Sequence, residues 1–481
     1  MTIRVLSIAS EAAPLVKTGG LADVAGALPN AVAAHDVAMT TLLPGYPAVL
    51  ARLGDAAQVH VWPSLLGEGA RLLAGMVGGQ PLLVLDAPAL FARDGGPYGD
   101  GNGRDWPDNG LRFAAFARAA ADVAGGAVRG LRFDLAHAHD WQAGLVPAYL
   151  RYAPAGKSVP SVMTIHNMAF QGFFPAALFP LLGLPDAAWS ISGVEYHGGV
   201  GYLKAGLEAA SAITTVSPTY AREIRSGEFG MGLEGLIRAR DGHVRGIVNG
   251  IDTREWNPAT DPALASRFSA RSLNRRAANR AALNAEFALD DGGPLFVVIS
   301  RLTWQKGMDV LLSAIDHLVG CGAQLALLGS GDKALEAGFA AAAARHRGRV
   351  GVRIGYDEAA SHRMQGGGDA ILVPSRFEPC GLTQLYGLAY GCVPVVARTG
   401  GLVDTVIDAN LASLAAGAAT GVQFNAVTYG ALTDAIERTV ALFADHAAWT
   451  AIQRAGMKAD FSWGRSGKAY ADLYGQVLEA A

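Results

Sequence analysis

The sequence predicts an α/β protein made of two doubly wound parallel-sheet domains that face each other across a cleft. Short apolar runs alternate with longer helical patterns along the whole chain, which is the signature of βαβ units. The runs are apolar on both faces, as in parallel strands covered by helices on either side. A turn-rich stretch at 249–260 separates two such series, and two sheets facing each other would share one ligand crevice.

The candidate strands follow in chain order. Those of the first half are Ile3–Ala9, Val37–Leu43, Leu82–Leu85, Phe133–Leu135, Val159–Ile165 and Ala212–Val216. Those of the second half are Leu295–Ile299, Gln324–Leu328, Val350–Ile354, Ala370–Val373 and Val393–Val396. Helix starts are marked between them, for example by Ser217 as an N-cap before Pro218.

These elements predict the domain boundaries. We expect an N-terminal domain over residues 1–248, a hinge over 249–260, a C-terminal domain over 261–457, and a C-terminal helix in 458–481 that packs back onto the first domain. An arginine-rich helical segment carries Arg267, Arg271, Arg275, Arg276 and Arg280. We expect it to be a solvated helix face rather than an anion-binding patch.

Composition excludes several classes of protein. The chain has 481 residues, of which 51% are hydrophobic and 17% charged, so it is not a disordered chain. A net charge of −3 gives no sign of a nucleic-acid partner or an anionic membrane surface, and no apolar run reaches the roughly 20 residues that span a bilayer. The three cysteines, Cys321, Cys380 and Cys392, are too scattered for a disulfide framework, which favours a reducing compartment and a cytoplasmic location.

The same loop pattern occurs twice. Lys17-Thr18-Gly19-Gly20-Leu21 follows the first strand, and Arg398-Thr399-Gly400-Gly401-Leu402 follows the strand at Val393–Val396. Glycines let the backbone approach a ligand, the following helix presents free N–H groups, and the cation adds charge. A tight turn would explain one such loop, but two favour binding of an anion. Neither loop is a Walker A motif, and no G-x-G-x-x-G follows the first strand, which argues against an NTPase and an ordinary dehydrogenase.

Polar residues at other strand ends indicate the ligand. Arg301 and Lys306 suit a diphosphate, and Glu378 suits the hydroxyls of a sugar. Asp140 and His166 suit sugar hydroxyls in the other domain. Together they suggest an activated sugar. A metal site is disfavoured because the chain has no D-x-D pair or H-E-x-x-H at these positions, and basic groups can neutralise a leaving diphosphate.

These motifs resemble those of the bacterial glycogen synthases and plant starch synthases, nearly end to end. The marks are Lys17–Val24, His139–Gly144, Thr164–Asn167 with Gln171-Gly172, Asn249–Asp252, Ser300–Gly307, Tyr356, Ser375–Gly387 and Thr399–Leu402. The resemblance implies a GT-B fold of two Rossmann-like domains and a retaining glucosyltransferase that uses ADP-glucose, with no metal or prosthetic group. Many relatives that use UDP- or GDP-sugars carry Glu-x7-Glu, whereas Tyr386 stands eight residues after Glu378 here, which puts UDP-glucose in doubt.

The resemblance also implies roles for single residues. Lys17, His166, Arg301, Lys306 and Glu378 would be catalytic: Lys17 and His166 at the donor glucose, Arg301 and Lys306 at the leaving diphosphate, and Glu378 at the glucose hydroxyls. Thr383 would contact phosphate, and Tyr356 would stack near adenine. The other implied substrate-binding residues are Gly19, Gly20, Asp23, Tyr98, Asp140, Asn167, Asn249, Cys380, Gly381, Leu382 and Thr399.

The implied reaction is transfer of glucose from ADP-glucose to the non-reducing 4-OH of glycogen or another α-1,4-glucan. Double displacement needs a carboxylate nucleophile about 5 Å from an acid partner, and the motifs offer no obvious pair. Front-face attack, with the departing phosphate accepting the proton of the acceptor, fits better. The alternatives are a phosphorylase-like or sucrose-synthase-like enzyme, a non-catalytic glucan-binding module and, more weakly, a Rossmann oxidoreductase. The combination of Lys17, Arg301, Lys306 and Glu378 argues against the binding module.

Overall fold

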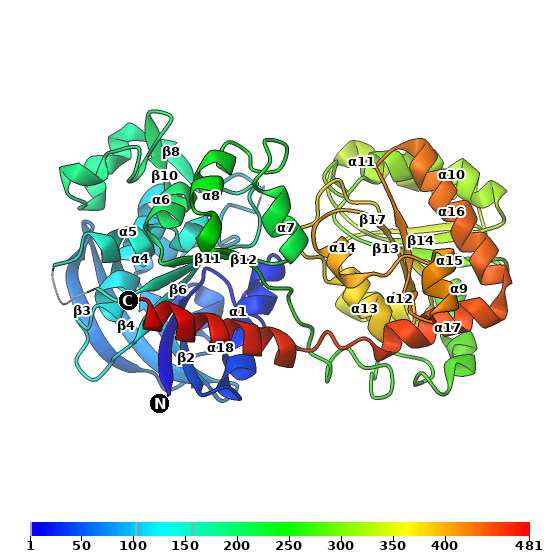
Figure 1. Ribbon diagram of the computed structural model, residues 1–481, viewed down its shortest axis with the longest axis horizontal. Helices are drawn as coiled ribbons and strands as arrows, with labels where there is room; N and C mark the ends of the chain where they lie inside the picture. The colour runs from blue at the N-terminus through cyan, green and yellow to red at the C-terminus, as the bar shows by residue number, and fades with distance from the viewer. Residues whose placement is uncertain (1, 102, 155–157) are drawn as a thin grey trace. The chain divides into compact units, whose positions relative to one another are not determined.

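The computed structural model describes residues 2–101, 103–154 and 158–481, and the chain divides into two compact units (Figure 1). Unit 1 comprises the chain up to Gly250 together with Trp463–Ala481, and unit 2 comprises Ile251–Ser462. The chain therefore passes between the units twice.

Most of the expected hinge at 249–260 is part of unit 2. The N–H of Ile251 donates to the carbonyl of Phe461 at 2.8 Å, and the side chains of Ile251 and Trp256 are buried beside Leu385 and Leu388. The stretch is rich in turn-forming residues, but its apolar side chains pack into the core of unit 2. The expected C-terminal segment is also divided, because residues up to Ser462 belong to unit 2 and the last helix to unit 1.

Unit 1 is built on a nine-stranded sheet with the order β12-β11-β7-β6-β1-β2-β5-β4-β3. Its strands are β1 (Ile3–Ile8), β2 (Val37–Pro44), β3 (Ala57–Leu65), β4 (Glu68–Val77), β5 (Gln80–Asp86), β6 (Leu135–His139), β7 (Ser161–Ile165), β11 (Ala212–Thr215) and β12 (Val244–Gly246). Its helices are α1 (Gly20–Ala33), α2 (Pro47–Leu50), α3 (Pro88–Phe91), α4 (Asn109–Ala124), α5 (Leu145–Arg151), α6 (Tyr202–Ala209), α7 (Pro218–Glu223), α8 (Glu234–Ala239) and α18 (Trp463–Glu479). A separate small sheet joins β8 (Phe173–Pro175), β9 (Glu195–Tyr196) and β10 (Gly199–Gly201).

Side-chain alternation along the strands divides the core of unit 1 into two layers. Val5 of β1 packs with apolar residues of α1 and α18, whereas Leu6 and Ile8 point to the opposite face, which α4 and α5 cover. α18 lies along α1, so the end of the chain covers the same face as its first helix (Figure 1).

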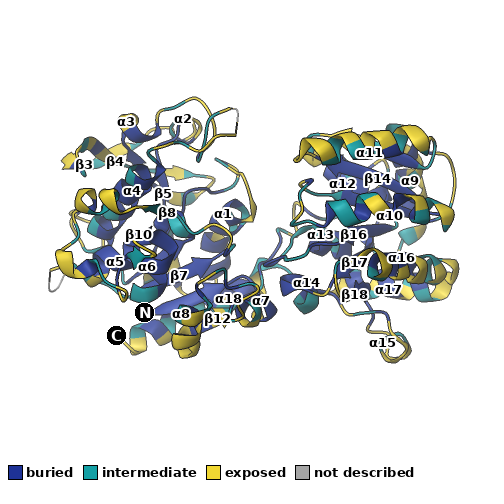
Figure 2. Cartoon of the chain, turned by 90° about the horizontal axis from the view of Figure 1, so that it is seen from above, coloured by how far each residue is buried: buried dark blue, intermediate teal, exposed yellow. Residues whose placement is uncertain are grey.

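Unit 2 has a six-stranded, fully parallel sheet with the order β15-β14-β13-β16-β17-β18. Its strands are β13 (Leu295–Ile299), β14 (Gln324–Gly329), β15 (Val350–Ile354), β16 (Ala370–Val373), β17 (Val393–Ala397) and β18 (Val422–Phe424). Its helices are α9 (Arg276–Phe287), α10 (Met308–Gly320), α11 (Lys333–Arg345), α12 (Glu358–Gly367), α13 (Thr383–Tyr390), α14 (Gly400–Thr405), α15 (Leu411–Ala415), α16 (Tyr429–Ala444) and α17 (His446–Lys458). The strands are buried and the helices expose their outer faces (Figure 2).

The predicted central strands are confirmed, most of them to within one or two residues, and Ser217 caps α7 as expected by accepting from the N–H of Tyr220. The strand expected at Phe133–Leu135 was misplaced. β6 begins at Leu135 and ends at His139, and His137 and His139 are fully buried within it. Polar side chains in a buried strand hide the apolar pattern on which the prediction rested. The antiparallel pair β3–β4 was missed for a related reason, since most residues of β3 are not buried.

The arginine-rich segment is not a solvated face throughout. Arg276 is buried and donates to the carbonyls of Gln365 and Gly368, and Arg280 pairs with Asp369. These two guanidinium groups bind α9 to the rest of unit 2. The expectation of a solvated helix face was therefore wrong for Arg276 and Arg280.

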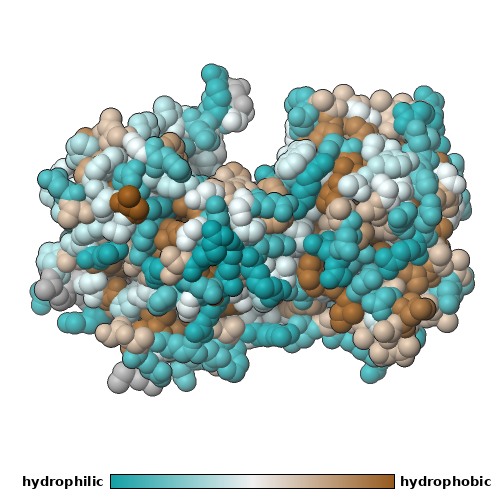
Figure 3. All heavy atoms as spheres, turned by 45° about the horizontal axis from the view of Figure 1, so that its top comes forward, coloured by the Kyte–Doolittle hydropathy of each residue, from teal (hydrophilic) through white to brown (hydrophobic). Residues whose placement is uncertain are grey.

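None of the helices in the described part of the chain is both long and apolar enough to cross a membrane. Apolar and polar side chains are interspersed over the face of the molecule that Figure 3 presents.

Candidate active site

The topology of each sheet marks one edge for ligand binding. In unit 1 the strand order reverses between β1 and β6, and in unit 2 it reverses between β13 and β16. Loops at the carboxyl ends of such neighbouring strands diverge and leave a crevice. Most of the residues expected from the sequence lie in these loops, in each unit separately.

In unit 1 the loop after β1 is organised by Glu11, a residue that the sequence analysis did not single out. Its buried carboxylate accepts from the N–H of Thr18, from Thr18 Oγ1 at 2.6 Å, and from the hydroxyl of Tyr98. Tyr98 also contacts Ser10 Oγ at 2.7 Å. Burial, and then the charge of Glu11, raise the pKa of Tyr98 well above its usual value. The residue after Thr18 is Gly19, so Glu11 fixes the start of the glycine pair.

The glycine pair itself is exposed. Gly19 is the N-cap of α1 and provides no side-chain cap, and a Cβ added to Gly19 or Gly20 would meet no atom within 4 Å. The first N–H groups of a helix have no intrahelical acceptor. Lys17 pairs with Asp23 at 2.8 Å on the first turn of α1, so these two expected site residues are neighbours. The loop leaves space that the protein itself does not fill.

A line of buried histidines connects β6 and β7. His139 Nδ1 lies 3.0 Å from His166 Nε2, and His139 Nε2 lies 3.2 Å from Ser7 Oγ. His137 contacts Thr164 Oγ1 at 2.6 Å and the hydroxyl of Tyr474 on α18 at 2.8 Å. Burial lowers the pKa of His139 to about 3 and holds the pKa values of His137 and His166 well below the usual range. His166 is therefore a neutral hydrogen-bonding group at neutral pH.

Asp140 supports the turn that carries His166 and Asn167. Its Oδ1 accepts from the N–H of His166 at 2.6 Å, and its backbone has a φ of 55°, a conformation that costs a non-glycine residue about 1–3 kcal/mol. Burial raises its pKa to about 7, although hydrogen bonds from the N–H groups of His166 and Asn167 lower it. The carboxyl of Asp140 therefore titrates near neutral pH.

Asn249 follows β12 and carries an unsatisfied acceptor. Its side chain is 4% exposed, and its Oδ1 has no hydrogen-bond partner among the described residues. A buried oxygen without a donor is uncommon and marks a position where a ligand can supply one.

In unit 2 the central contact joins two of the expected catalytic residues. Lys306 comes after β13 and Glu378 after β16, and Lys306 Nζ lies 2.6 Å from Glu378 Oε2. Ser375, which is fully buried, donates to the same oxygen at 2.8 Å. The two side chains are 17% and 10% exposed, so the ion pair is largely shielded from water.

The other expected residues of unit 2 lie around this pair. The side chain of Arg301, at the end of β13, is exposed and makes no hydrogen bond or ion pair with any residue that the structure describes. Thr383 is the first residue of α13 and follows Cys380, Gly381 and Leu382 in the loop after β16. Tyr356, after β15, is 73% exposed. An exposed guanidinium, a helix start and an exposed ring suit a phosphate and an aromatic base.

The second glycine pair is tightly enclosed, unlike the first. Thr399 is the buried N-cap of α14. A Cβ on Gly400 would lie 1.9 Å from the carbonyl oxygen of Glu378, and one on Gly401 would lie 2.3 Å from that of Cys380. The N–H of Gly401 donates to the carbonyls of Glu378 and Pro379 at 3.1 Å. This loop holds the backbone that carries Glu378.

Sequence reasoning missed two of the residues that organise the site, Glu11 and Tyr474, and named Ser375 only as the start of a motif. A polar residue two or three positions after a strand was the available signal for Ser375 and Glu11. Nothing in the sequence indicated Tyr474, because its partner His137 lies 337 residues away in the chain.

Comparison with known proteins identifies the family. Residues 4–239 match the starch synthase catalytic domain, and residues 279–445 match the glycosyl transferases of group 1. Glycogen synthase from Novosphingobium aromaticivorans is 73% identical over 481 residues, and that from Mesorhizobium japonicum is 60% identical over 479, each covering 99% of both chains.

Solved structures agree with these matches. The catalytic domain of starch synthase IV from Arabidopsis thaliana, solved with ADP and acarbose, has a TM-score of 0.90 at 32% identity over the whole of both chains. A sucrose-phosphate synthase from Thermosynechococcus elongatus shares the fold, with a TM-score of 0.62 at 18% identity. The chain has the GT-B fold and belongs to the glycogen synthase family of glycosyltransferases.

Proposed function

We propose that this chain elongates glycogen by transferring glucose from ADP-glucose to the non-reducing 4-OH of an α-1,4-glucan, with retention of anomeric configuration. The observation that carries this proposal is the Lys306–Glu378 pair at the switch point of unit 2, with the unpaired Arg301 on the same loop as Lys306. The starch synthase of known structure was solved with ADP and acarbose, which supports a nucleotide-sugar donor and a glucan acceptor here.

Arg301 and Lys306 would stabilise the diphosphate as it leaves. The guanidinium of Arg301 can form two parallel bonds to phosphate oxygens, and the ammonium of Lys306 adds a point charge. The N-terminus of α13 at Thr383 would add backbone N–H groups. These groups can neutralise the leaving charge without a metal, so we expect no metal or prosthetic group in the reaction. Tyr356 would lie against adenine.

Unit 1 would hold the sugar groups. Gly19 and Gly20 leave room for the donor, and the neutral His166 can exchange hydrogen bonds with sugar hydroxyls without competing for phosphate. Asp140 would act mainly by holding His166 and Asn167 in place. Lys17, Asp23, Tyr98 and Asn249 complete the expected sugar-binding set.

The carboxylates of these loops favour front-face attack over a covalent intermediate. Glu378 is bound to Lys306 and Ser375, Glu11 to Thr18 and Tyr98, and Asp140 to backbone N–H groups. A carboxylate that already accepts such bonds is a weak nucleophile. The leaving phosphate would then accept the proton of the attacking 4-OH.

Glucose incorporation into glycogen from ADP-glucose and from UDP-glucose tests the proposal. We expect ADP-glucose to be the better donor and EDTA to leave the rate unchanged. The matched control for Lys306→Ala is Lys468→Ala, because Lys468 pairs with Asp472 at 2.7 Å on the exposed side of α18 and belongs to none of the strand-end loops. A faster rate with UDP-glucose, or an equal loss of rate in both variants, would contradict the proposal.

The free state of the three cysteines supports our expectation of a cytoplasmic location.

A further inference from the structure

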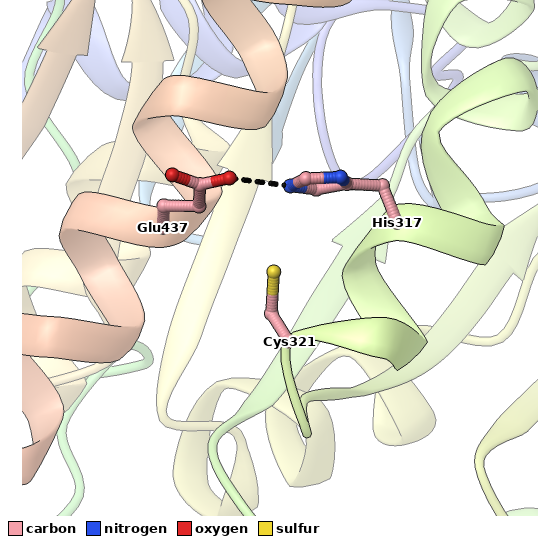
Figure 4. A group of neighbouring side chains, drawn as sticks. All are labelled: His317, Cys321 and Glu437. Carbon is pink, nitrogen blue, oxygen red and sulfur yellow. Dashed lines mark ion pairs between the residues drawn. The ribbon is translucent and has the colours of Figure 1, made fainter.

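Three side chains with metal-binding atoms converge in unit 2, outside the loops described above. His317 and Cys321 belong to the end of α10 and Glu437 to α16, and we refer to them as the α10–α16 cluster. One ligand atom from each lies within 4.8 Å of the other two. Figure 4 shows the imidazole, the thiol and the carboxylate pointing toward one shared space. His317 lies about 14 Å along α10 from its first residue, at a rise of about 1.5 Å per residue, so the cluster is separate from the loop that carries Lys306.

The backbone holds these side chains together. His317 and Cys321 are four residues apart, which places them on the same face of the helix. The N–H of Cys321 donates to the carbonyl of His317 at 2.9 Å. α10 and α16 pack against each other through a shared core that includes Ile315 and Ile436. The positions of the three ligand atoms thus follow from the packing of the two helices.

One atom of the cluster has an ion-pair partner, drawn as a dashed line in Figure 4, but no hydrogen bond of good geometry. His317 Nε2 is closed off from solvent and makes no hydrogen bond of acceptable geometry with a described residue, although Glu437 Oε1 lies only 2.9 Å away. His346 offers a contrast, because its Nε2 makes a hydrogen bond with Asp316 at 2.6 Å. A buried nitrogen in this state requires an explanation, and a bound ion is one of the few that exist.

We propose that the α10–α16 cluster binds a zinc-class divalent cation through His317, Cys321 and Glu437. Nitrogen, sulfur and one carboxylate oxygen are the ligands that Zn²⁺ takes, whereas Mg²⁺ and Ca²⁺ prefer oxygen alone. Three protein ligands leave a fourth position for water. The bound cation would clamp α10 to α16. Binding requires the thiolate, so the proton of Cys321 is released to solvent.

Equilibrium dialysis of the full chain against Zn²⁺, with Co²⁺ as a spectroscopic probe, tests this proposal. We expect one equivalent of Zn²⁺ to bind, a thiolate-to-cobalt absorption band to appear, and Zn²⁺ to protect Cys321 from alkylation. Cys380 and Cys392 are buried, so alkylation of the folded protein should occur at Cys321. Peptide mapping identifies the modified cysteine. Cys321→Ser and Glu437→Gln should each weaken binding at least tenfold, since loss of even a supporting outer-shell partner costs about 10–100-fold. Zn²⁺ should also raise the melting temperature, and these variants should lose that increase.

The control is His346→Ala, which removes an imidazole that, like His317, pairs with a carboxylate but that belongs to neither candidate metal cluster. It should keep the full affinity for Zn²⁺. A second candidate cluster, Glu255, Glu358 and His362, provides the contrary outcome. Binding that survives Cys321→Ser and is lost in His362→Ala would overturn the proposal, as would absence of the cobalt–thiolate band in the folded protein.

Discussion

The loops at 17–21 and 398–402 share Thr-Gly-Gly-Leu and a place at the start of the helix that follows a strand, but their glycines have different surroundings. A Cβ on Gly20 would meet nothing within 4 Å, whereas one on Gly401 would lie 2.3 Å from a backbone oxygen. The first loop is held at its start by Glu11 and leaves its glycines exposed. The second is bonded to the backbone of Glu378 and Pro379. The same motif therefore leaves open space in unit 1 and fixes the segment that carries Glu378 in unit 2.

The groups beside the two loops differ as well. Unit 1 buries neutral histidines together with Asp140, whereas unit 2 presents a lysine–glutamate ion pair. The stability of the two units should consequently respond differently to acid.

Acid should destabilise unit 1 first. The pKa values of His137, His139 and His166 are lowered by burial, so below about pH 6.5 the unfolded chain binds protons that the folded chain does not. Each histidine costs up to about 1.4 kcal/mol per pH unit in this range. Asp140, with its pKa raised to about 7, gains a similar amount on folding as the pH falls and offsets one of the three. The three histidines together outweigh Asp140, so the net effect of acid on unit 1 is destabilising. Calorimetry between pH 7.5 and 5.5 should show the unfolding transition of unit 1 move to lower temperature before that of unit 2. His139→Gln should reduce this shift in temperature. Equal shifts of both unfolding transitions would contradict the prediction.

Gly401→Ala should destabilise unit 2 by about 1–3 kcal/mol, the usual cost of forcing atoms into a packed site. Its Cβ would collide with the carbonyl of Cys380 and displace the segment that carries Glu378. Urea denaturation measures the loss of stability. An unchanged midpoint would mean that the second loop is as open as the first.

Thr18→Val should cost about 1–2 kcal/mol, because the buried carboxylate of Glu11 loses one of its donors. The N–H of Thr18 still donates to Glu11, which limits the effect. We expect a moderate loss of transfer activity through displacement of Gly19. Thr303→Val is a suitable control, since Thr303 Oγ1 is buried without a hydrogen-bond partner among the described residues. Equal losses in both variants would argue against the role of Glu11.

Gly20→Ala should have the smallest effect on stability, with a melting temperature unchanged or slightly raised, because Gly20 lies in α1 and alanine favours a helix by about 0.5–1 kcal/mol. Transfer of glucose should nevertheless fall, because the added methyl group occupies the space left for the donor. Full activity in this variant would show that the space is not used.

The sequence was sufficient for the features that depend on local patterns. Buried parallel strands such as β13 and β16 are apolar throughout, and polar residues at their ends mark the crevice. The contacts between distant residues could not be read in this way. Lys306 and Glu378 were expected to bind different parts of the donor, but they lie 72 residues apart in the chain and only the fold shows that they form an ion pair. β6 was misplaced because its buried histidines give it the polar pattern of a loop. The difference between the two glycine pairs depends on backbone atoms of another loop, the one after β16, which contacts only the second pair.

We expect Lys306 to act on the leaving diphosphate and Glu378 to hold the ammonium group of Lys306 in place. Lys306→Ala should reduce turnover by about 10²–10³-fold, the usual effect of removing one donor to transition-state charge. It should also lower stability, because Glu378 is left as an uncompensated, largely buried charge. The double variant Lys306→Met, Glu378→Gln removes both charges and separates these effects.

Turnover per folded molecule in this double variant, measured with its melting temperature, is the most direct test. We predict that the melting temperature recovers toward that of the wild type while turnover stays reduced by at least about 10²-fold, since the ammonium group is still missing. Recovery of both melting temperature and turnover would show that Lys306 only stabilises the fold and takes no part in the reaction.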